Sequence, residues 1–466
     1  MDAQLSAERE ATAAVEQALA LELTAVPAES DQSAAIQELA AALHHRASLD
    51  DQVVRRREQH ADALRAGVTT LLPEVWVGTD ALLGALGEHA DDLAVRATSD
   101  RDAAAALRDI ASVLVETDLP DVTAHRTGPP ERDASTAYRT APPPPVTEEQ
   151  LLACLSAHSG PGVTVHRITD VRMLSGGFSK EMLAVRVEHS GGADDIVIRK
   201  VASGRTAHTL GGEFAALSFA WQGGVPVAEP LWLDEDILGA PAFATRRVPG
   251  QPRGDVWGPT APIELPAVTA IAAALARLHS LDTSGLTDTP LPPMVTRQEI
   301  VAAIEERQAV LAAVSTPSMP FATLFALVLG WLRAHAPGDV RDPVLVHGDY
   351  GLHNLLLDGS TLTAVLDWER SHLGDPAEDL TYVRPSVEAV AGWDAFLTAY
   401  QDAGGSPPDA DRLTFYTVWH DVWRGISAYR MRAKFLANPN KMSDAMAGLL
   451  MTPRFLLRAV RTAFRL

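Results

Sequence analysis

The sequence predicts an α+β protein in which an all-helical amino-terminal segment precedes a sheet-rich part and then a mostly helical part. Up to about Arg126, apolar residues recur at helical spacing among Ala, Leu, Glu, Asp and Arg, as at Ile36 and Leu39. After Thr147, short alternating segments are separated by Gly-rich turns, which is typical of strands. After Pro249 the helical spacing returns, with one interruption by short β segments.

Length and composition bound the possible functions. At 466 residues the chain is long enough for two or three domains. Its net charge of −21 repels phosphate backbones, so nucleic acid is not an expected partner. No stretch approaches the roughly 20 apolar residues that span a bilayer. The amino terminus lacks the pattern of a secretory signal, and a single cysteine, Cys154, excludes an intrachain disulfide, so we expect a cytoplasmic protein.

A proline-rich stretch over residues 127–146 predicts an extended linker, because helical spacing is lost there. We therefore expect an all-helical accessory domain over residues 1–126. Dimerisation of the chain, covering of a cleft and binding of another protein all remain open as its role. A sheet-rich lobe over residues 147–248 and a helical lobe over residues 249–466 should follow.

Within the two lobes, individual elements can be placed. A short helix ends near Leu155, and strands are expected around residues 163–174, 182–188 and 195–201. Helices are expected over residues 271–281 and 322–335.

Three polar residues stand out in the late β segments. Asp349 follows His347-Gly348, Asn354 comes five positions later, and Asp367 follows a second apolar strand. Two strands joined by a turn would bring these side chains to one edge. A carboxylate beside a hydroxyl can orient it and accept its proton, while an Asn oxygen and a second carboxylate form a hard oxygen site for Mg²⁺ that bridges nucleotide phosphates. This set predicts phosphoryl transfer.

Two upstream features fit the same chemistry. A Gly-rich turn between two predicted strands serves equally well as a hairpin turn or as a phosphate-binding loop. This turn consists of Gly176, Gly177, Phe178 and Ser179. Further on, Arg199 ends a strand and Glu213 lies on a helix, and such a pair can clamp the inner phosphates of a nucleotide.

The order of the motifs SGGFS, IVIR, a helical Glu, LHSLD, VHGDYGLHN and LDWE resembles the aminoglycoside phosphotransferase and choline kinase superfamily. The resemblance covers about residues 147–430 and implies a two-lobed protein-kinase-like fold. The stretch DWERSHLGDPAEDLTYVR looks most like the phosphotransferases associated with acyl-CoA dehydrogenases, which implies a hydroxylated acyl or other metabolic acceptor.

By this likeness Asp349 would be the catalytic base, Asn354 and Asp367 the Mg²⁺ ligands, and residues 176–179 the phosphate cover. Arg199 would replace the usual nucleotide-binding lysine, with Glu213 as its partner, since strand alternation points the adjacent Lys200 away. ATP is the implied phosphoryl donor, GTP is its alternative, and the acceptor is a hydroxyl of a small molecule. His347 is expected to support the loop through a hydrogen bond, and Asp379 is expected to have a structural role.

Acceptor contacts are less defined. His353, where relatives carry a small residue or proline, either faces substrate or fills the loop. His420 and Arg424 lie one helical turn apart and would suit an anionic acceptor, or they form part of a solvated helix face. An aminoglycoside or other antibiotic kinase and a non-catalytic nucleotide-binding module are the competing functions.

Overall fold

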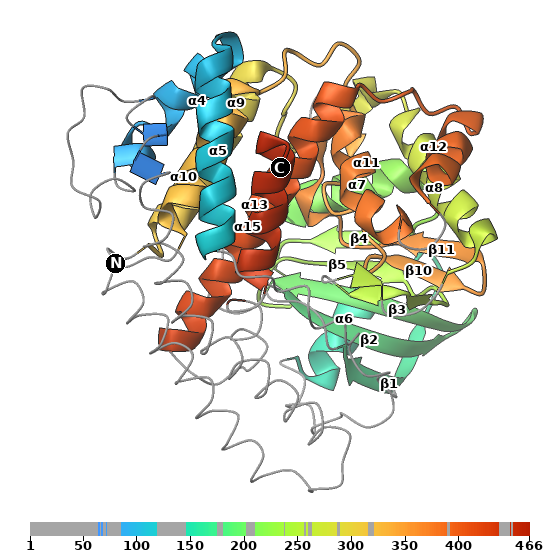
Figure 1. The fold of residues 1–466 in the computed structure, drawn as a ribbon. Helices are drawn as coiled ribbons and strands as arrows, with labels where there is room; N and C mark the ends of the chain where they lie inside the picture. Colours follow the sequence, from blue (N-terminus) through green and yellow to red (C-terminus); the bar gives the residue numbers. More distant parts are fainter. Residues whose placement is uncertain are drawn as a thin grey trace, which may run out of the picture. The chain divides into compact units, whose positions relative to one another are not determined.

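A computed structural model shows the fold of the chain (Figure 1). The described residues are 64–65, 67–68, 71, 85–118, 146–174, 180–201, 210–236, 238–255, 258–259, 263–286, 289–315, 321–388, 392–437, 448 and 451–466. They belong to two compact units. The described residues within 1–130, 296–339 and 410–466 belong to the first unit, and those within 131–295 and 340–409 belong to the second.

The second unit begins with a helix and a five-stranded antiparallel sheet whose order is β1-β2-β3-β5-β4. Its elements are α6 (Glu148–Ala157), β1 (Val165–Met173), β2 (Lys180–His189), β3 (Gly192–Val201), α7 (Leu210–Gln222), β4 (Pro230–Asp234) and β5 (Ala242–Arg246). Thr147 caps α6 by accepting a hydrogen bond from the Gln150 backbone. The three strands and the short helix predicted from the sequence are confirmed.

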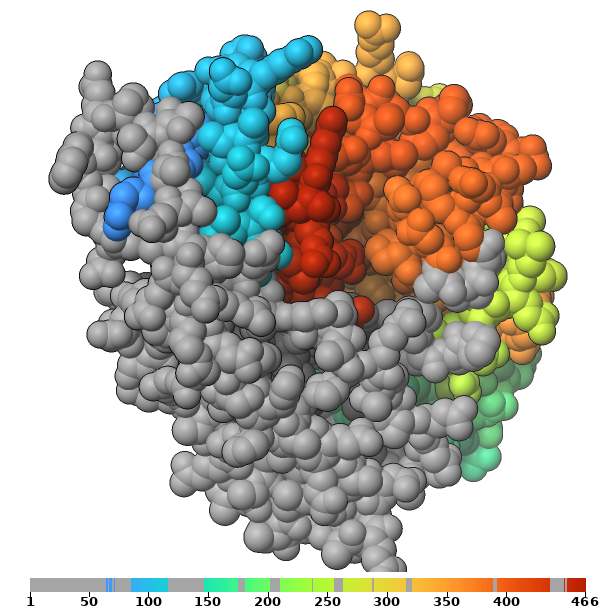
Figure 2. Space-filling model, viewed as in Figure 1, coloured from blue at the N-terminus to red at the C-terminus, as the bar shows by residue number. Residues whose placement is uncertain are grey.

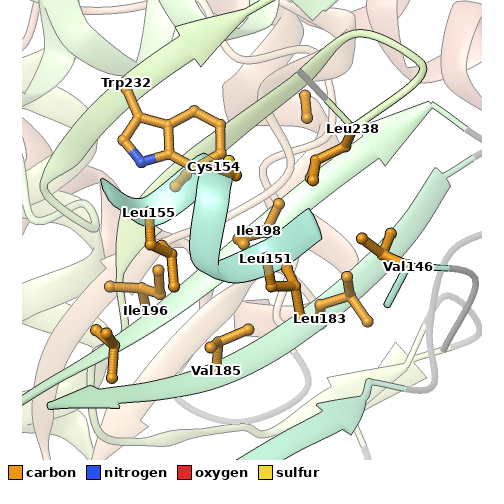
Figure 3. Close-up of a cluster of buried hydrophobic side chains, with 13 residues drawn as sticks. Val146, Leu151, Cys154, Leu155, Leu183, Val185, Ile196, Ile198, Trp232 and Leu238 are labelled. Atoms are coloured by element: carbon orange, nitrogen blue, oxygen red, sulfur yellow. The ribbon is translucent and has the colours of Figure 1, made fainter. Parts of the chain in front are cut away.

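The core of this sheet lies under α6. Leu151, Cys154 and Leu155 project from the helix onto Leu183 and Ile198, which alternation places on one face of β2 and β3 (Figure 3). All five are buried. Burial raises the pKa of the Cys154 thiol to about 12, so this cysteine packs as a small apolar residue.

The rest of the second unit consists of short strands and helices. These are β6 (Gln251–Pro252), β7 (Gly254–Asp255), β8 (Gly258–Pro259), α8 (Leu265–His279), η2 (Thr283–Leu286), β9 (Val344–Val346), β10 (Leu355–Asp358), β11 (Thr361–Val365), η3 (Trp368–Arg370), β12 (His372–Gly374), α11 (Pro376–Glu388) and α12 (Trp393–Asp402). Strands β10 and β11 form an antiparallel hairpin in which Leu355 pairs with Val365. Helix α8 packs against β9 and β11, and α12 packs against α8.

The first unit is helical over its described residues. It contains α4 (Ala90–Ser99), α5 (Arg101–Asp118), α9 (Arg297–Ala312), α10 (Ala322–Ala334), α13 (Ala410–Ala437) and α15 (Thr452–Phe464). Asp100 caps α5 by accepting hydrogen bonds from the backbone of Asp102 and Ala103. The helices α5 and α15, drawn in cyan and red, lie against each other in Figure 2.

Helix α4 approaches α10 closely because a glycine lies at their contact. A Cβ at Gly330 would come within 2.7 Å of the Ala90 carbonyl oxygen. Beside it, Arg333 forms an ion pair with Asp91 at 2.5 Å. Residues 85–118 therefore pack against α10 and α15. Most of residues 1–84 and residues 127–145 lie outside the described part, so the accessory domain and the linker stay predictions.

Across the described part of the chain, no helix combines the length and apolar character that a membrane crossing requires.

Candidate active site

The loop between β9 and β10 places Asp349. It begins with a tight turn at Gly348, whose φ of +78° lies in the left-handed region and whose missing side chain leaves room for the Arg370 carbonyl oxygen, 2.7 Å from where a Cβ would stand. His347 then fixes the loop through both ring nitrogens. Its Nε2 donates to the Leu366 carbonyl at 2.9 Å, and its Nδ1 accepts the Asp349 N–H at 3.2 Å. The supporting role expected for His347 is confirmed.

The β10–β11 hairpin brings Asn354 and Asp367 to the same edge. Asn354 immediately precedes β10 and Leu366 immediately follows β11, and the Leu366 N–H donates to the Asn354 carbonyl at 2.8 Å. The Asn354 amide nitrogen donates to Asp349 twice, to the backbone oxygen at 3.0 Å and to Oδ2 at 3.1 Å. Its side-chain oxygen therefore remains the available acceptor.

Asp367 is joined to the five-stranded sheet by Arg199. The Arg199 guanidinium contacts Glu213 Oε1 through Nη1 at 2.5 Å and Asp367 Oδ1 through Nη2 at 2.6 Å. Lys200, the next residue on β3, points to the other face and pairs with Glu181 at 3.1 Å. Strand alternation thus selects arginine, not lysine, as the cation at this position.

The surroundings of Asp349 keep it ionised. Burial by itself disfavours the charged carboxylate, but the His353 imidazole, the charge of Arg370 and a hydrogen bond from Tyr382 outweigh burial. The pKa of Asp349 therefore lies well below its usual range. His353 Nε2 lies 3.4 Å from Asp349 Oδ1. An ionised carboxylate at this point can accept a hydrogen bond from an incoming hydroxyl and take its proton as the phosphoryl group is transferred.

A buried carboxylate, Asp379 on α11, supports the loop from behind. Its Oδ2 accepts the His347 N–H and its Oδ1 accepts the Gly348 N–H, both at 2.8 Å. His279 Nε2 lies 3.2 Å from Asp379 Oδ2, and His279 Nδ1 lies 2.9 Å from the Tyr400 hydroxyl. The structural role expected for Asp379 is confirmed, and three helices contribute to it.

The oxygen ligands at this edge fit a magnesium–nucleotide complex better than an all-protein metal site. Among the residues with described positions, no three or more His, Cys, Asp or Glu side chains are grouped so as to hold a metal ion. Mg²⁺ usually takes one or two protein oxygens and completes its shell with water and phosphate oxygens. Asp367 and the Asn354 side-chain oxygen can supply these protein ligands.

Other predicted site residues have different outcomes. The turn formed by residues 176–179 lies outside the described residues, so its role as a phosphate cover stays a prediction. His420 and Arg424 are both on α13 in the first unit. The His420 side chain is buried, with 3% of its surface exposed, and Arg424 Nη1 lies 3.6 Å from the buried Asp421. Their role as acceptor contacts also stays a prediction.

Four residues of the site were not given a role from the sequence. Tyr382 and Arg370 influence Asp349, and His279 and Tyr400 stabilise Asp379. A signal existed for Tyr382, since a residue three positions after Asp379 lies on the same helix face. The partnership of His279 and Tyr400 joins positions 121 residues apart, and no local pattern reports it.

Comparison with known proteins identifies the family. Residues 170–416, more than half of the chain, match the model of the phosphotransferase enzyme family. Mouse acyl-CoA dehydrogenase family member 10 is 34% identical over 197 residues, covering 40% of this chain and 18% of that protein. Chicken acyl-CoA dehydrogenase family member 11 is 29% identical over 201 residues, covering 41% and 25%. The match thus spans only about a fifth to a quarter of the length of these relatives.

A shorter relative and a solved structure agree with this result. Streptomycin 3''-kinase from Streptomyces griseus is 28% identical over 294 residues, covering 56% of this chain and 97% of that protein. A structure from Ralstonia eutropha, assigned to the aminoglycoside phosphotransferases, superposes with a TM-score of 0.55 at 21% identity and covers 69% of this chain and 99% of that one. The chain has the kinase-like fold predicted for it, and it belongs to the phosphotransferase enzyme family.

Proposed function

We propose that this protein is a kinase that uses Mg²⁺ and ATP to phosphorylate a hydroxyl group of a small molecule. The observation that carries the proposal is the junction at the β10–β11 hairpin, where Asn354 contacts Asp349 and Arg199 contacts Asp367. This junction supports the proposal because it joins, from three separate parts of the sequence, residues suited to accept a proton, to ligate a hard cation and to bind phosphate.

Each residue has a defined task in this proposal. Asp349 orients the acceptor hydroxyl and receives its proton, and its low pKa keeps it ionised at neutral pH. Asn354 and Asp367 would hold the cation, while Arg199, oriented by Glu213, would bind the inner phosphates. The bound magnesium nucleotide would supply the phosphoryl group and neutralise its charge. Gly176, Gly177, Phe178 and Ser179 would cover the phosphates.

The acceptor is proposed from the relatives. Because the chain resembles acyl-CoA dehydrogenase family members, a hydroxylated acyl compound is our first candidate. His353 supports an acceptor position beside the base, since its ring lies 3.4 Å from Asp349. His420 and Arg424 are the further proposed contacts. The similarity to streptomycin 3''-kinase favours an antibiotic acceptor as the second candidate.

The decisive experiment is turnover of Mg²⁺-ATP, and separately of Mg²⁺-GTP, against a panel of hydroxyacyl-CoAs, hydroxylated metabolites and aminoglycosides, with products identified by mass. Wild type should form a phosphorylated product and Asp349→Ala should not. Asp358→Ala, an exposed position at the far end of β10, is the matched control and should retain turnover. Tight nucleotide binding with no product from any acceptor would instead favour a non-catalytic nucleotide-binding module.

The antibiotic alternative has its own test. Expression in a susceptible host should raise its tolerance to at least one aminoglycoside, and Asp349→Ala should abolish the effect. Unchanged tolerance across drug classes would exclude this acceptor group.

A further inference from the structure

Arg199 contacts two carboxylates with two different nitrogen atoms. Nη1 pairs with Glu213 at 2.5 Å and Nη2 pairs with Asp367 at 2.6 Å. The planar guanidinium can span both because its donors are fixed in a fork, whereas a lysine has a single Nζ. One cation on β3 thereby joins α7 to Asp367, the second residue after β11.

The two ion pairs differ in how easily they open. The Glu213 side chain is 1% exposed, so loss of its cation would leave a buried charge, which is costly. The Asp367 side chain is 33% exposed, and water can replace the arginine there. The Arg199–Asp367 pair is therefore the one that can exchange while Glu213 keeps its partner.

The proposed cation site depends on the Asp367 carboxylate, and one of its oxygens, Oδ1, is engaged by a guanidinium. A carboxylate paired in this way attracts a second cation less strongly, since the positive charge of Arg199 lies 2.6 Å away. Phosphate oxygens offer the guanidinium an alternative acceptor of higher charge. The Nε of Arg199, which is buried and has no hydrogen-bond partner among the described residues, adds a third donor to this group.

We propose that Arg199 is a positioning residue that couples metal binding to nucleotide binding. Without nucleotide, its guanidinium holds Asp367 and keeps the affinity for a free divalent cation low. When phosphates arrive, the guanidinium turns to them and releases Asp367 to the metal. This inference rests on the proposed role of Asp367 as a metal ligand.

The test measures Mn²⁺ binding by electron paramagnetic resonance, with and without a non-hydrolysable ATP analogue. In Arg199→Lys the single Nζ should remain with the buried Glu213, so Asp367 is freed. Mn²⁺ should then bind about tenfold more tightly than to wild type in the absence of nucleotide. The factor by which the analogue tightens Mn²⁺ binding should fall correspondingly.

A second variant should act in the opposite direction. Glu213→Gln removes the competing carboxylate, so Arg199 should hold Asp367 more firmly and Mn²⁺ should bind several-fold more weakly without nucleotide. This variant decides the question if Arg199→Lys does not fold.

The matched control is Arg246→Lys. Arg246 lies on the neighbouring strand β5 and also contacts two carboxylates, Glu229 at 2.7 Å and Asp194 at 2.5 Å, but it has no contact with Asp367 among the described residues. It should leave Mn²⁺ binding unchanged in both conditions.

The outcomes separate this inference from the proposed function. If Asp367→Asn binds Mn²⁺ as well as wild type in the presence of the analogue, Asp367 is not a metal ligand. Both the metal site of the proposed function and the coupling through Arg199 would then be refuted. If Asp367→Asn loses Mn²⁺ while Arg199→Lys and Glu213→Gln match wild type, the metal site stands and the coupling through Arg199 is overturned.

Discussion

Replacement of Asp379 by asparagine should disrupt the loop between β9 and β10 that carries Asp349, without changing any group that we propose takes part in the reaction. The Asp379 side chain is fully buried and its two oxygens accept the N–H groups of His347 and Gly348. Asparagine offers one oxygen and one NH₂ group, so one of these backbone donors would face another donor. The change keeps the shape of the side chain and removes its charge.

The magnitude follows from these contacts. A hydrogen bond to a charged group contributes about 1.5–3 kcal/mol, and a buried donor left unpaired costs about 1–3 kcal/mol. We therefore expect a loss of about 3–5 kcal/mol in the stability of the second unit, or a fall in its Tm of about 10 °C. If about half of this free energy must be supplied to return Asp349 to its position in the transition state, the activation barrier rises by that amount. The value of kcat then falls by roughly 10- to 70-fold.

The assay pairs thermal unfolding with turnover of Mg²⁺-ATP and the best acceptor of the panel. Asp282→Asn is the control, because Asp282 is a surface residue whose carboxylate accepts the Ser284 N–H at 3.0 Å, a bond that asparagine can also make. Asp282→Asn should match wild type. If Asp379→Asn unfolds at the same temperature as Asp282→Asn and keeps full turnover, the idea that Asp379 positions the loop is refuted.

Three further predictions concern a turn, a buried histidine and an ion pair. Gly348→Ala should lower stability by at least ~1 kcal/mol and kcat/KM by about tenfold or more, because an alanine in the left-handed conformation would clash with the Arg370 carbonyl oxygen. Unchanged kinetics and an unchanged urea midpoint would contradict this. Burial lowers the pKa of His372, but Glu378 at 3.1 Å raises it more, so the pKa of His372 in the folded protein is raised. The stability that the charged His372 contributes is therefore fully present below about pH 6.5 and is lost as the pH rises through the folded pKa. Urea midpoints should decline over that interval for wild type and less for His372→Gln; equal slopes would count against the pair. Arg458→Ala should cost the first unit about 1.5–3 kcal/mol, because it removes the two hydrogen bonds to the buried Asp421 at 2.7 and 3.1 Å and leaves Arg424, 3.6 Å away, as the remaining cation. The exposed Arg461→Ala on the same helix should be neutral in a thermal melt. Equal melting of these two variants would argue against the pair.

Much of the fold was accessible from local patterns. The strands near residues 163–174, 182–188 and 195–201 and the helix near residues 322–335 were predicted because period-two and period-3.6 patterns reflect burial on one face. The hairpin after Asn354 was predicted for the same reason, and its register places Leu355 opposite Val365. The sequence also identified Asp349, Asn354, Asp367, Arg199 and Glu213, which the structure brings together in pairs.

Local patterns did not reveal how the helical parts combine. The described residues of the amino-terminal segment pack against α10 and α15, which come from chain segments more than 200 residues away. That contact depends on small features such as the room left by Gly330 beside Ala90. A missing side chain in one helix carries no signal about which distant helix will approach it.

The sequence by itself determined the fold class and the phosphotransferase motifs, and it singled out the residues to which we assign the proposed chemistry, because these depend on residue type and short spacing. Only the tertiary structure decided which charges meet. It added Asp367 as a second carboxylate on Arg199, beside the partner Glu213 expected from the sequence, and directed the Asp379 carboxylate to the backbone of the loop that carries Asp349. Such contacts join side chains across the fold, and their strength depends on distance and burial, which chain folding sets and local sequence does not encode.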